Sequence, residues 1–362
     1  GRVGNSPFEL RHLKLKVKGR PMAPGSLLAV IRHQLIDSLK SQLESFPNRP
    51  VAQNSLIDIR HDALHHRNDP CSSNAASPRL RVVCRSLDQL EQLIGLEVDD
   101  IIADFADIRQ YRAAAEIAAR SDIALYLATP RIQKPGEMGI FLAMRHHTGV
   151  GILVRNLAGL RYFCDAGCPV DADFSLNAAN DLTVDLLRQW GARRVTASYD
   201  LNREQLFELL GHTEPSDVEV VIHQHMPMFH MEHCVFCAVL SPGTNKTNCG
   251  RPCDDHVVQL RDRVGMEHPL TADVGCRNTL FNATPQSAAE AVPQMLQLGV
   301  VHFRVELLWD TPAAITRIIQ LYRELLVGTI RGGDVWTQLK AVNRVGVTRG
   351  TLEERRNPLA IL

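Results

Sequence analysis

The sequence lacks a long hydrophobic run and is poor in aromatic residues. Its 362 residues contain no apolar run of about eighteen or more, the length of a membrane-spanning helix, so we expect no membrane partner. The formal net charge of +0 at pH 7 gives the chain as a whole no attraction to nucleic acid. Phe, Trp and Tyr make up 5% of the residues, too few to indicate a stacking surface. Any site for a polyanion must therefore be local.

Signatures of several common enzyme classes are also absent. No G-x-G-x-x-G follows the first apolar run, which argues against a dinucleotide-binding sheet. Neither H-E-x-x-H nor G-x-S-x-G occurs, so the chain carries no motif of a zinc protease or a serine hydrolase. The chain opens Gly-Arg-Val-Gly, without Met or an apolar signal segment, and we interpret it as a piece of a longer protein.

The sequence does contain a regular alternation of short apolar runs and helical stretches. Such an alternation predicts parallel strands joined by right-handed helical crossovers. Eight units over about 250 residues fit a TIM-type (β/α)8 barrel at residues 79–330 better than an open doubly wound sheet. The predicted strands are Leu80–Cys84, Asp100–Phe105, Ile123–Thr129, Val150–Arg155, Val170–Ser175, Arg194–Tyr199, Val218–His223 and Val301–Leu308.

The segments before and after the barrel differ from this pattern. In residues 1–50, leucine and valine alternate with lysine from Leu13 to Lys18, which predicts a strand, and a helix follows from Gly25 to about Ser45. The lysines can bind phosphate or face solvent. Residues 51–78 are polar and without a period, which indicates a linker with solvated histidines rather than a second metal site. Residues 331–362 are expected to form a C-terminal extension.

Five of the nine cysteines form a Cys-rich insertion directly after the seventh predicted strand. Their spacing is C-x2-C-x11-C-x3-C-x22-C, and they are Cys234, Cys237, Cys249, Cys253 and Cys276. A chain of this length builds its core without disulfides, so the cluster indicates metal binding in a reducing compartment, cytoplasmic or organellar. Thiolates suit zinc or an iron–sulfur cluster, and four are enough for either, so the spacing leaves both open.

Two ionisable residues lie where the carboxyl ends of the strands should meet, which is where the catalytic groups of such barrels sit. His223 closes the seventh predicted strand and Glu306 lies in the eighth. Both are candidates for proton transfer or substrate anchoring, and a buried structural pair is the alternative. Further histidines of the cysteine-rich segment can hydrogen-bond to a cluster sulfur or be solvated, and they are His225, His230 and His233.

Three arginines near the cysteines are candidates for substrate binding. Arg251, Arg277 and Arg304 can each hold a carboxylate or a phosphate through the planar guanidinium fork. Surface ion pairs with the neighbouring Asp254 or Asp255 would explain these arginines equally well.

These residues resemble the peptidase U32, or collagenase-like, family. The family pattern is a strand ending in His that leads into two cysteines, then an Asn/Gly-x-Cys-x3-Cys turn, a later cysteine, and a strand of the type Phe-Lys/Arg-Ile/Val-Glu. The matching positions are Val220–His223, Cys234, Asn248–Cys253, Cys276 and Phe303–Glu306. The resemblance covers roughly residues 80–328, and residues 1–50 look like the end of a domain that follows a first U32 module. An upstream module of the same polypeptide is therefore an expected partner.

The resemblance implies an iron–sulfur barrel enzyme that hydroxylates a base of ribosomal or transfer RNA without molecular oxygen. Prephenate or a related metabolite is implied as the hydroxyl source. A [4Fe–4S] cluster is expected on four of the five clustered thiols, with Zn as the alternative cofactor. Cys237 has no counterpart in the family pattern, so it either substitutes for one of the other four ligands or is a neighbouring free thiol.

Departures from the family pattern leave other functions open. Pro227 stands where the commoner members have their first cysteine, and the stretch Met226–Met228 is more like the branch that hydroxylates a quinone ring. After Glu306 the chain continues Leu-Leu-Trp instead of Gly-Arg. The alternatives are a quinone-type aromatic substrate, a collagenase-like peptidase, and a zinc-stabilised barrel that binds RNA or a partner chain.

Overall fold

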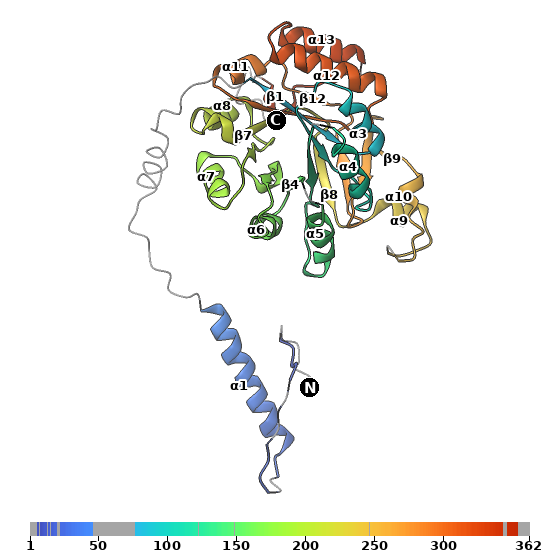
Figure 1. Ribbon diagram of the computed structural model, residues 1–362. Helices are drawn as coiled ribbons and strands as arrows, with labels where there is room; N and C mark the ends of the chain where they lie inside the picture. The colour runs from blue at the N-terminus through green and yellow to red at the C-terminus, as the bar shows by residue number, and fades with distance from the viewer. Residues whose placement is uncertain are drawn as a thin grey trace. The chain divides into compact units, whose positions relative to one another are not determined.

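The computed structural model (Figure 1) describes residues 6, 8–12, 14, 16–19, 22–45, 77–121, 123–147, 149–245, 247–342 and 346–353. The chain forms two compact units, Gly1–His61 and Asp62–Leu362. Most of the linker predicted at residues 51–78, with its histidines, lies outside the described residues. No helix among the described residues is both long enough and apolar enough to cross a membrane.

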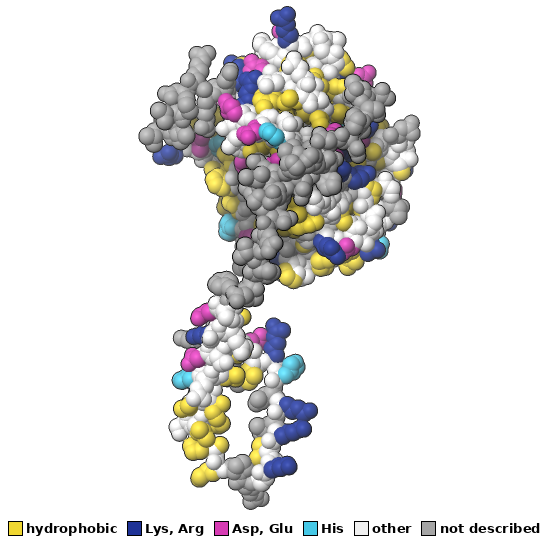
Figure 2. Space-filling model, turned by 90° about the vertical axis from the view of Figure 1, so that its left-hand side faces the viewer, with side chains coloured by type: hydrophobic (Ala, Val, Ile, Leu, Met, Phe, Trp, Pro, Cys, Tyr) yellow, Lys and Arg dark blue, Asp and Glu magenta, His cyan; other side chains and the backbone are white. Residues whose placement is uncertain are grey.

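The first unit contains the helix α1 (Gly25–Glu44), which the sequence predicted. Ile36 is buried, whereas most other apolar side chains of α1 are exposed, and Figure 2 shows hydrophobic side chains gathered along this helix. The strand predicted before it is not formed by the described residues 14 and 16–18, and the alternating leucines lie outside the described residues. A strand needs a neighbour to satisfy its N–H and C=O groups, and the described part of this unit supplies none.

Eight parallel strands close into a barrel in the second unit. Consecutive strands pair from β1 to β7, and β13 pairs with both β7 and β1, which closes the ring. The predicted TIM-type (β/α)8 barrel and its eight strands are confirmed. The strands are β1 (Arg79–Cys84), β2 (Asp100–Ala103), β3 (Ala124–Ala128), β4 (Gly151–Val154), β5 (Val170–Ala172), β6 (Val195–Thr196), β7 (Val218–Gln224) and β13 (His302–Glu306).

Helices cover the outside of the barrel (Figure 1). Several begin at a polar residue whose side chain accepts a backbone N–H of the first turn: Ser86, Asn156, Asn180 and Asn202. Such a cap satisfies an N–H that has no partner in the helix and contributes about 1 kcal/mol. The helices are α3 (Leu87–Ile94), α4 (Gln110–Ala118), α5 (Met138–Arg145), α6 (Leu157–Asp165), α7 (Asp181–Gln189), α8 (Arg203–Gly211), α11 (Val292–Gln297), α12 (Pro312–Leu326) and α13 (Gly332–Val342), with short 3-10 turns η1 (Pro135–Glu137), η2 (Phe174–Leu176), η3 (Pro215–Asp217) and η4 (Gly350–Leu352).

Side chains of the strands alternate between the helices and the barrel interior. On β1, Leu80 and Val82 belong to the apolar core under the helices, whereas Arg81 is fully buried inside the barrel. Nη1 of Arg81 lies 2.9 Å from a carboxylate oxygen of Asp171 on β5 and 2.8 Å from one of Glu219 on β7. Charged side chains thus form a layer of the barrel interior, whereas branched apolar side chains form such layers in most TIM barrels.

A second buried arginine extends this set of ion pairs toward the mouth of the barrel. Arg304 on β13 contacts Asp173 at 2.6 Å and Glu219 at 3.4 Å. Burial alone would raise the pKa of Glu219, but Arg81 and Arg304 outweigh burial and lower it to about 2. Each of these charges depends on its partners, because an unpaired charge in the interior is strongly unfavourable.

An insertion between β7 and β13 carries the clustered cysteines. Its antiparallel sheet has the order β8-β11-β10-β9, and Phe236, Leu270 and Leu280 form a small core of its own. The short β12 then pairs antiparallel with the end of β7, so the insertion leaves and returns at the carboxyl end of that strand. The elements are β8 (Pro227–Met231), α9 (Val235–Leu240), α10 (Pro252–Asp255), β9 (Val258–Arg261), β10 (Glu267–Ala272), β11 (Asn278–Phe281) and β12 (Gln286–Ser287).

Ion pairs of one arginine connect the insertion to the barrel. Arg277, just before β11, is 1% exposed and contacts Glu232 of the insertion at 2.6 Å. It also contacts Glu137, which lies in η1 between β3 and α5, at 2.9 Å. Lys134 precedes η1 and pairs with Glu232 as well. These ion pairs join two segments that are far apart in the sequence.

Replacing Glu219 by Gln should lower the free energy of unfolding at neutral pH by about 3–5 kcal/mol, because two buried arginines lose a carboxylate. The lowered pKa means that the charge of Glu219 stabilises the fold above its ordinary pKa of 4.5, and that this stabilisation is lost as the pH falls toward 2. Glu219→Gln should therefore remove part of the acid sensitivity in this range, which chemical denaturation at a series of pH values measures. Glu204→Gln, at an exposed position of α8, is the matched control. Equal stability of the wild type and Glu219→Gln would contradict the role of the buried ion pairs.

Replacing Arg277 by Gln should loosen the insertion while leaving the barrel folded. We expect amide hydrogen exchange in β8 and β11 to become about tenfold faster, which corresponds to about 1.4 kcal/mol, because charged hydrogen bonds between the insertion and η1 are lost. The control is Arg261→Gln, since Arg261 pairs with Glu267 inside the insertion and does not reach the barrel. Unchanged exchange in the Arg277 variant would show that other contacts hold the insertion.

Candidate functional site at the barrel mouth

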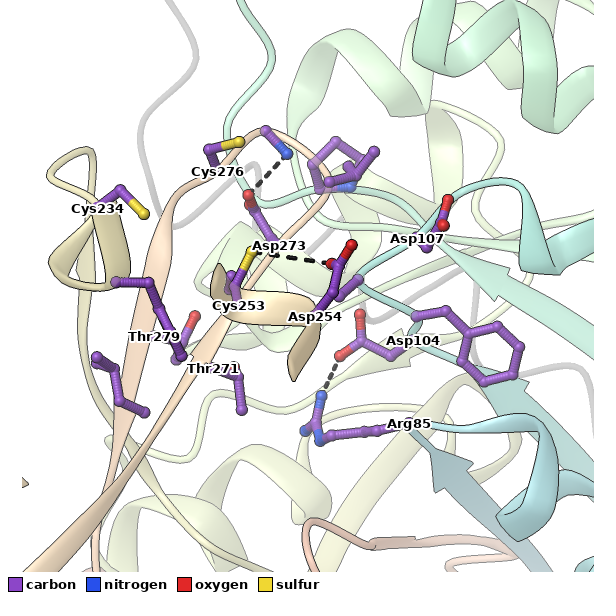
Figure 3. Close-up of a pocket in the computed structure, with 18 of the residues that line it drawn as sticks. Arg85, Asp104, Asp107, Cys234, Cys253, Asp254, Thr271, Asp273, Cys276 and Thr279 are labelled. Atoms are coloured by element: carbon purple, nitrogen blue, oxygen red, sulfur yellow. Dashed lines mark hydrogen bonds and ion pairs between the residues drawn. The ribbon is translucent and has the colours of Figure 1, made fainter. Parts of the chain in front are cut away.

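A cavity of ≈ 1520 Å³ lies between the carboxyl ends of the barrel strands and the insertion. All five clustered cysteines belong to its lining, together with charged residues from the strand ends such as Arg85 and Asp104. Figure 3 shows Cys234, Cys253 and Cys276 on separate segments of the insertion, with Asp104 and Arg85 on the barrel side. The fold therefore brings the predicted ligands to the end of the barrel at which TIM-barrel enzymes act.

Backbone N–H groups point at two of the cysteine sulfurs. Cys234 immediately precedes α9, and its sulfur accepts a hydrogen bond of 3.5 Å from the N–H of Cys237. The sulfur of Cys249 accepts a hydrogen bond of 3.4 Å from the N–H of Arg251. Hydrogen bonds to sulfur favour the thiolate over the thiol and tune the sulfur ligands of iron–sulfur clusters.

Left-handed backbone conformations place two more of the five thiols. Cys253 lies in α10, which directly follows Gly250 and Arg251, whose φ angles are 69° and 55°. Cys276 itself has a φ of 61°, and its N–H donates to the carbonyl of Asp273 at 3.0 Å. This conformation costs a residue other than glycine about 1–2 kcal/mol, so the surrounding contacts must hold both turns.

The thiols lie close enough to influence one another's charge. Burial and the neighbouring carboxylate of Asp254 raise the pKa of Cys253 to about 11, and Cys234 and Cys276 contribute to this rise. Burial also raises the pKa of Cys237, with a contribution from Cys249. Thiolates gathered in this way repel one another, and a bound cation would remove the repulsion, so the donor set fits zinc or iron in its chemistry. Among the described residues, no group of three His, Cys, Asp or Glu side chains is arranged closely enough to hold a metal ion.

Charged residues from the strand ends form the barrel side of the cavity. Asp104, after β2, contacts Arg155 at 2.7 Å and also pairs with Arg85. Burial would raise the pKa of Asp104, but the two arginines outweigh it and hold the pKa well below its usual range. Glu306 contacts Arg85 and Arg304, each at 3.4 Å, yet burial dominates and raises its pKa. A carboxyl group with a raised pKa can carry a proton to a reacting atom.

His223 lies outside the lining of the cavity. It is 3% exposed, its ring centroid is 5.6 Å from that of Tyr322, and burial lowers its pKa to about 4. Glu306, by contrast, lines the cavity, as do the predicted His230 and His233. The proton-transfer roles of His223 and Glu306 stay predictions, and the structure places the carboxyl group nearer to the site.

The three predicted arginines have different surroundings. Arg251 lines the cavity and pairs with Asp254 at 2.9 Å. Arg304 is fully buried inside the barrel, and the side chain of Arg277 is held by the ion pairs that fasten the insertion. The structure thus places Arg251 at the cavity and holds the other two guanidinium groups in internal ion pairs.

Some charged residues of the lining were not singled out from the sequence. They are Arg85, Asp104, Arg131 and Arg155. Each lies at, or within two residues of, the carboxyl end of a predicted strand, which is the signal that could have found them.

Solved structures give only remote similarities. The spore cortex-lytic enzyme SleL of Bacillus cereus is 8% identical with a TM-score of 0.37, over 70% of this chain and 74% of that chain. SleL of Bacillus megaterium QM B1551 is 10% identical with a TM-score of 0.34, over 69% of this chain and 75% of that chain. Similarities this remote carry no argument about function, and no curated protein sequence significantly matches the chain.

A protein-family profile gives the informative match. The profile of Peptidase family U32 matches residues 113–355, which is more than half of the chain. The matched range runs from α4 past α13 and includes the whole insertion with its five cysteines. The chain therefore belongs to peptidase family U32.

Proposed function

We propose that this chain is an iron–sulfur enzyme that hydroxylates an uncharged planar ring without molecular oxygen, and that the ring is a base of ribosomal or transfer RNA. Prephenate or a related metabolite would supply the hydroxyl group and be the compound that is reduced, as the family resemblance implies. The observation that carries the proposal is that five thiols and a carboxyl group of raised pKa line one cavity at the barrel mouth. Family membership and the TIM-type fold are compatible with an enzyme.

Four of the thiols would hold a [4Fe–4S] cluster: Cys234, Cys249, Cys253 and Cys276. The fifth, Cys237, donates its S–H to the carbonyl of Gly243 at 3.4 Å, as a thiol that stays protonated would do. When bound, such a cluster supplies one-electron transfer. Zinc suits the same ligands but has no redox chemistry.

The lining favours an uncharged ring over a polyanion. Its described residues include ten Asp or Glu and five Arg, so a phosphodiester backbone would meet an excess of negative charge. Apolar side chains such as Phe105, Phe236 and Trp309 are part of the same lining. An RNA base turned out of its strand could enter and stack against such side chains while the backbone stays outside.

A quinone-type aromatic is the second candidate. The acidic and apolar lining suits a ring that carries no phosphate, and the stretch Met226–Met228 resembles the quinone-hydroxylating branch of the family. In either reaction Glu306 would deliver or accept a proton at the ring, because burial raises its pKa and its side chain lines the cavity.

Anaerobically purified protein should contain about four iron and four sulfide per chain, the content of one [4Fe–4S] cluster. Cys249→Ser and Cys253→Ser should each lose most of both, because serine replaces a soft sulfur ligand by oxygen. Iron, sulfide and zinc quantification with electron paramagnetic resonance of the reduced protein measures this. Cys168→Ser, outside the lining, should keep the wild-type content. Full iron content in both Cys249→Ser and Cys253→Ser would refute the ligand set, and stoichiometric zinc without sulfide would favour a zinc-stabilised barrel.

A strain that lacks the protein should accumulate RNA in which one base lacks an oxygen atom, which mass spectrometry of nucleosides detects. Glu306→Gln should lower product formation by about 10²–10⁴-fold with the iron and sulfide content unchanged, because proton transfer is lost while the thiols remain. Glu204→Gln is again the control, since it removes a carboxylate from an exposed position. Unaltered nucleosides together with an altered quinone pool would identify the second candidate. If neither changes, the proposed hydroxylation is wrong.

A further inference from the structure

The arginines that line the cavity differ in whether a carboxylate neutralises them. Arg85, Arg109, Arg155 and Arg251 each form an ion pair with an acidic side chain. Arg131 belongs to the same lining, and no ion pair or hydrogen bond joins its side chain to any residue that the structure describes. Its charge is therefore available to a bound ligand.

The side chain of Arg131 lies against a pair of aromatic rings. The guanidinium carbon lies over the ring of Phe174, 5.0 Å from its centroid. The ring centroid of Phe174 lies 4.0 Å from that of Tyr199 in turn. Contact with an aromatic ring uses none of the guanidinium N–H donors, so Phe174 positions Arg131 without occupying its hydrogen-bonding groups.

The backbone that leads to Arg131 is attached to the end of β4. Thr129 accepts a hydrogen bond of 2.9 Å from the N–H of Arg155 through its hydroxyl oxygen. The carbonyl of Pro130 accepts one of 2.9 Å from the side-chain N–H of Asn156. A cation on such a fixed strand end loses little conformational freedom when a ligand binds.

Arg131 acts on both sides of the cavity. Burial lowers the pKa of His230, on β8 of the insertion, to about 4, and the charge of Arg131 contributes to this shift. On the barrel side, its guanidinium carbon lies over the ring of Phe174, which lines the same cavity. A ligand bound to Arg131 would thus lie between the barrel and the insertion, in the cavity that the cysteines line.

We propose that Arg131 is an anion-binding residue that takes one oxyanion, a carboxylate or a phosphate, of a substrate or co-substrate in this cavity. The planar pair of N–H donors at the edge of a guanidinium matches two oxygens of either group. The acidic residues of the lining select a ligand with a single anionic group, because each additional negative charge would be repelled.

The anion site adds a substrate-binding residue to the proposed function. It rests on that function for one assumption, which is that substrates bind in this cavity. Anion binding needs no turnover, so it can be measured separately from hydroxylation. A chain that binds an anion through Arg131 but forms no hydroxylated product would refute the proposed function and keep the anion site.

Titration calorimetry of the intact chain with benzoate and with inorganic phosphate tests the proposal. The wild type should bind at least one probe, and Arg131→Gln should bind it about 10–100-fold more weakly, because charged hydrogen bonds are lost. Arg131→Lys keeps the positive charge but lacks the planar pair of N–H donors, so its affinity for the probe should lie between those of the wild type and Arg131→Gln. Arg145→Gln, at an exposed position of α5 outside the lining, removes an equal charge and should bind like the wild type.

The two probes distinguish the source of the oxyanion. Tighter binding of benzoate identifies a carboxylate, and tighter binding of phosphate identifies a phosphate group. Circular dichroism establishes that the variants are folded, and Arg131→Lys provides the test if Arg131→Gln is not. Equal affinity in the wild type and the Arg131 variants, or no binding of either probe to the wild type, overturns the assignment.

Discussion

Two fully buried guanidinium groups, those of Arg81 and Arg304, share the carboxylate of Glu219 inside the barrel. Taking such charges out of water is unfavourable by several kcal/mol per ion unless each meets its partner. Strands β1, β7 and β13 must therefore close in one arrangement, because a shift of one residue would turn these side chains away from each other. The ion pairs thus specify the register of the barrel, whereas the apolar core under the helices supplies the burial that drives folding.

The same charges connect the interior to the cavity. Arg304 contacts Asp173, Glu219 and Glu306, and Glu306 lines the cavity. A carboxyl group at the top of this network is oriented by its partners and still desolvated enough for its pKa to rise. The stability of the barrel and the protonation of a candidate catalytic group consequently depend on one set of side chains.

The insertion places thiols over these charges. The chain enters and leaves the insertion beside the carboxyl end of β7. The ion pair between Arg277 and Glu137 of η1 is a further connection to the barrel. If the proposed metal binds, it would offset the entropy of fixing the long irregular stretches of the insertion. Soft donors from the insertion and charged groups from the barrel thereby meet across one cavity.

Much of the fold could be predicted from local patterns. All eight barrel strands coincide with apolar runs, because the side chains that face the helices are apolar and the period is local. The sixth strand was predicted too long, and it is reduced to Val195–Thr196. The buried pair of Arg81 and Glu219 could not be predicted, because 138 residues separate them.

By itself the sequence determined the barrel and the position of the cysteine-rich segment after its seventh strand, because periodicity and residue type are properties of short segments. Only the tertiary structure decided which arginines can bind a ligand. Arg304 and Arg277 form internal ion pairs, whereas Arg131 lines the cavity without one among the described residues. Whether a charge is free depends on which distant carboxylate the closed barrel brings beside it, and no local pattern contains that information.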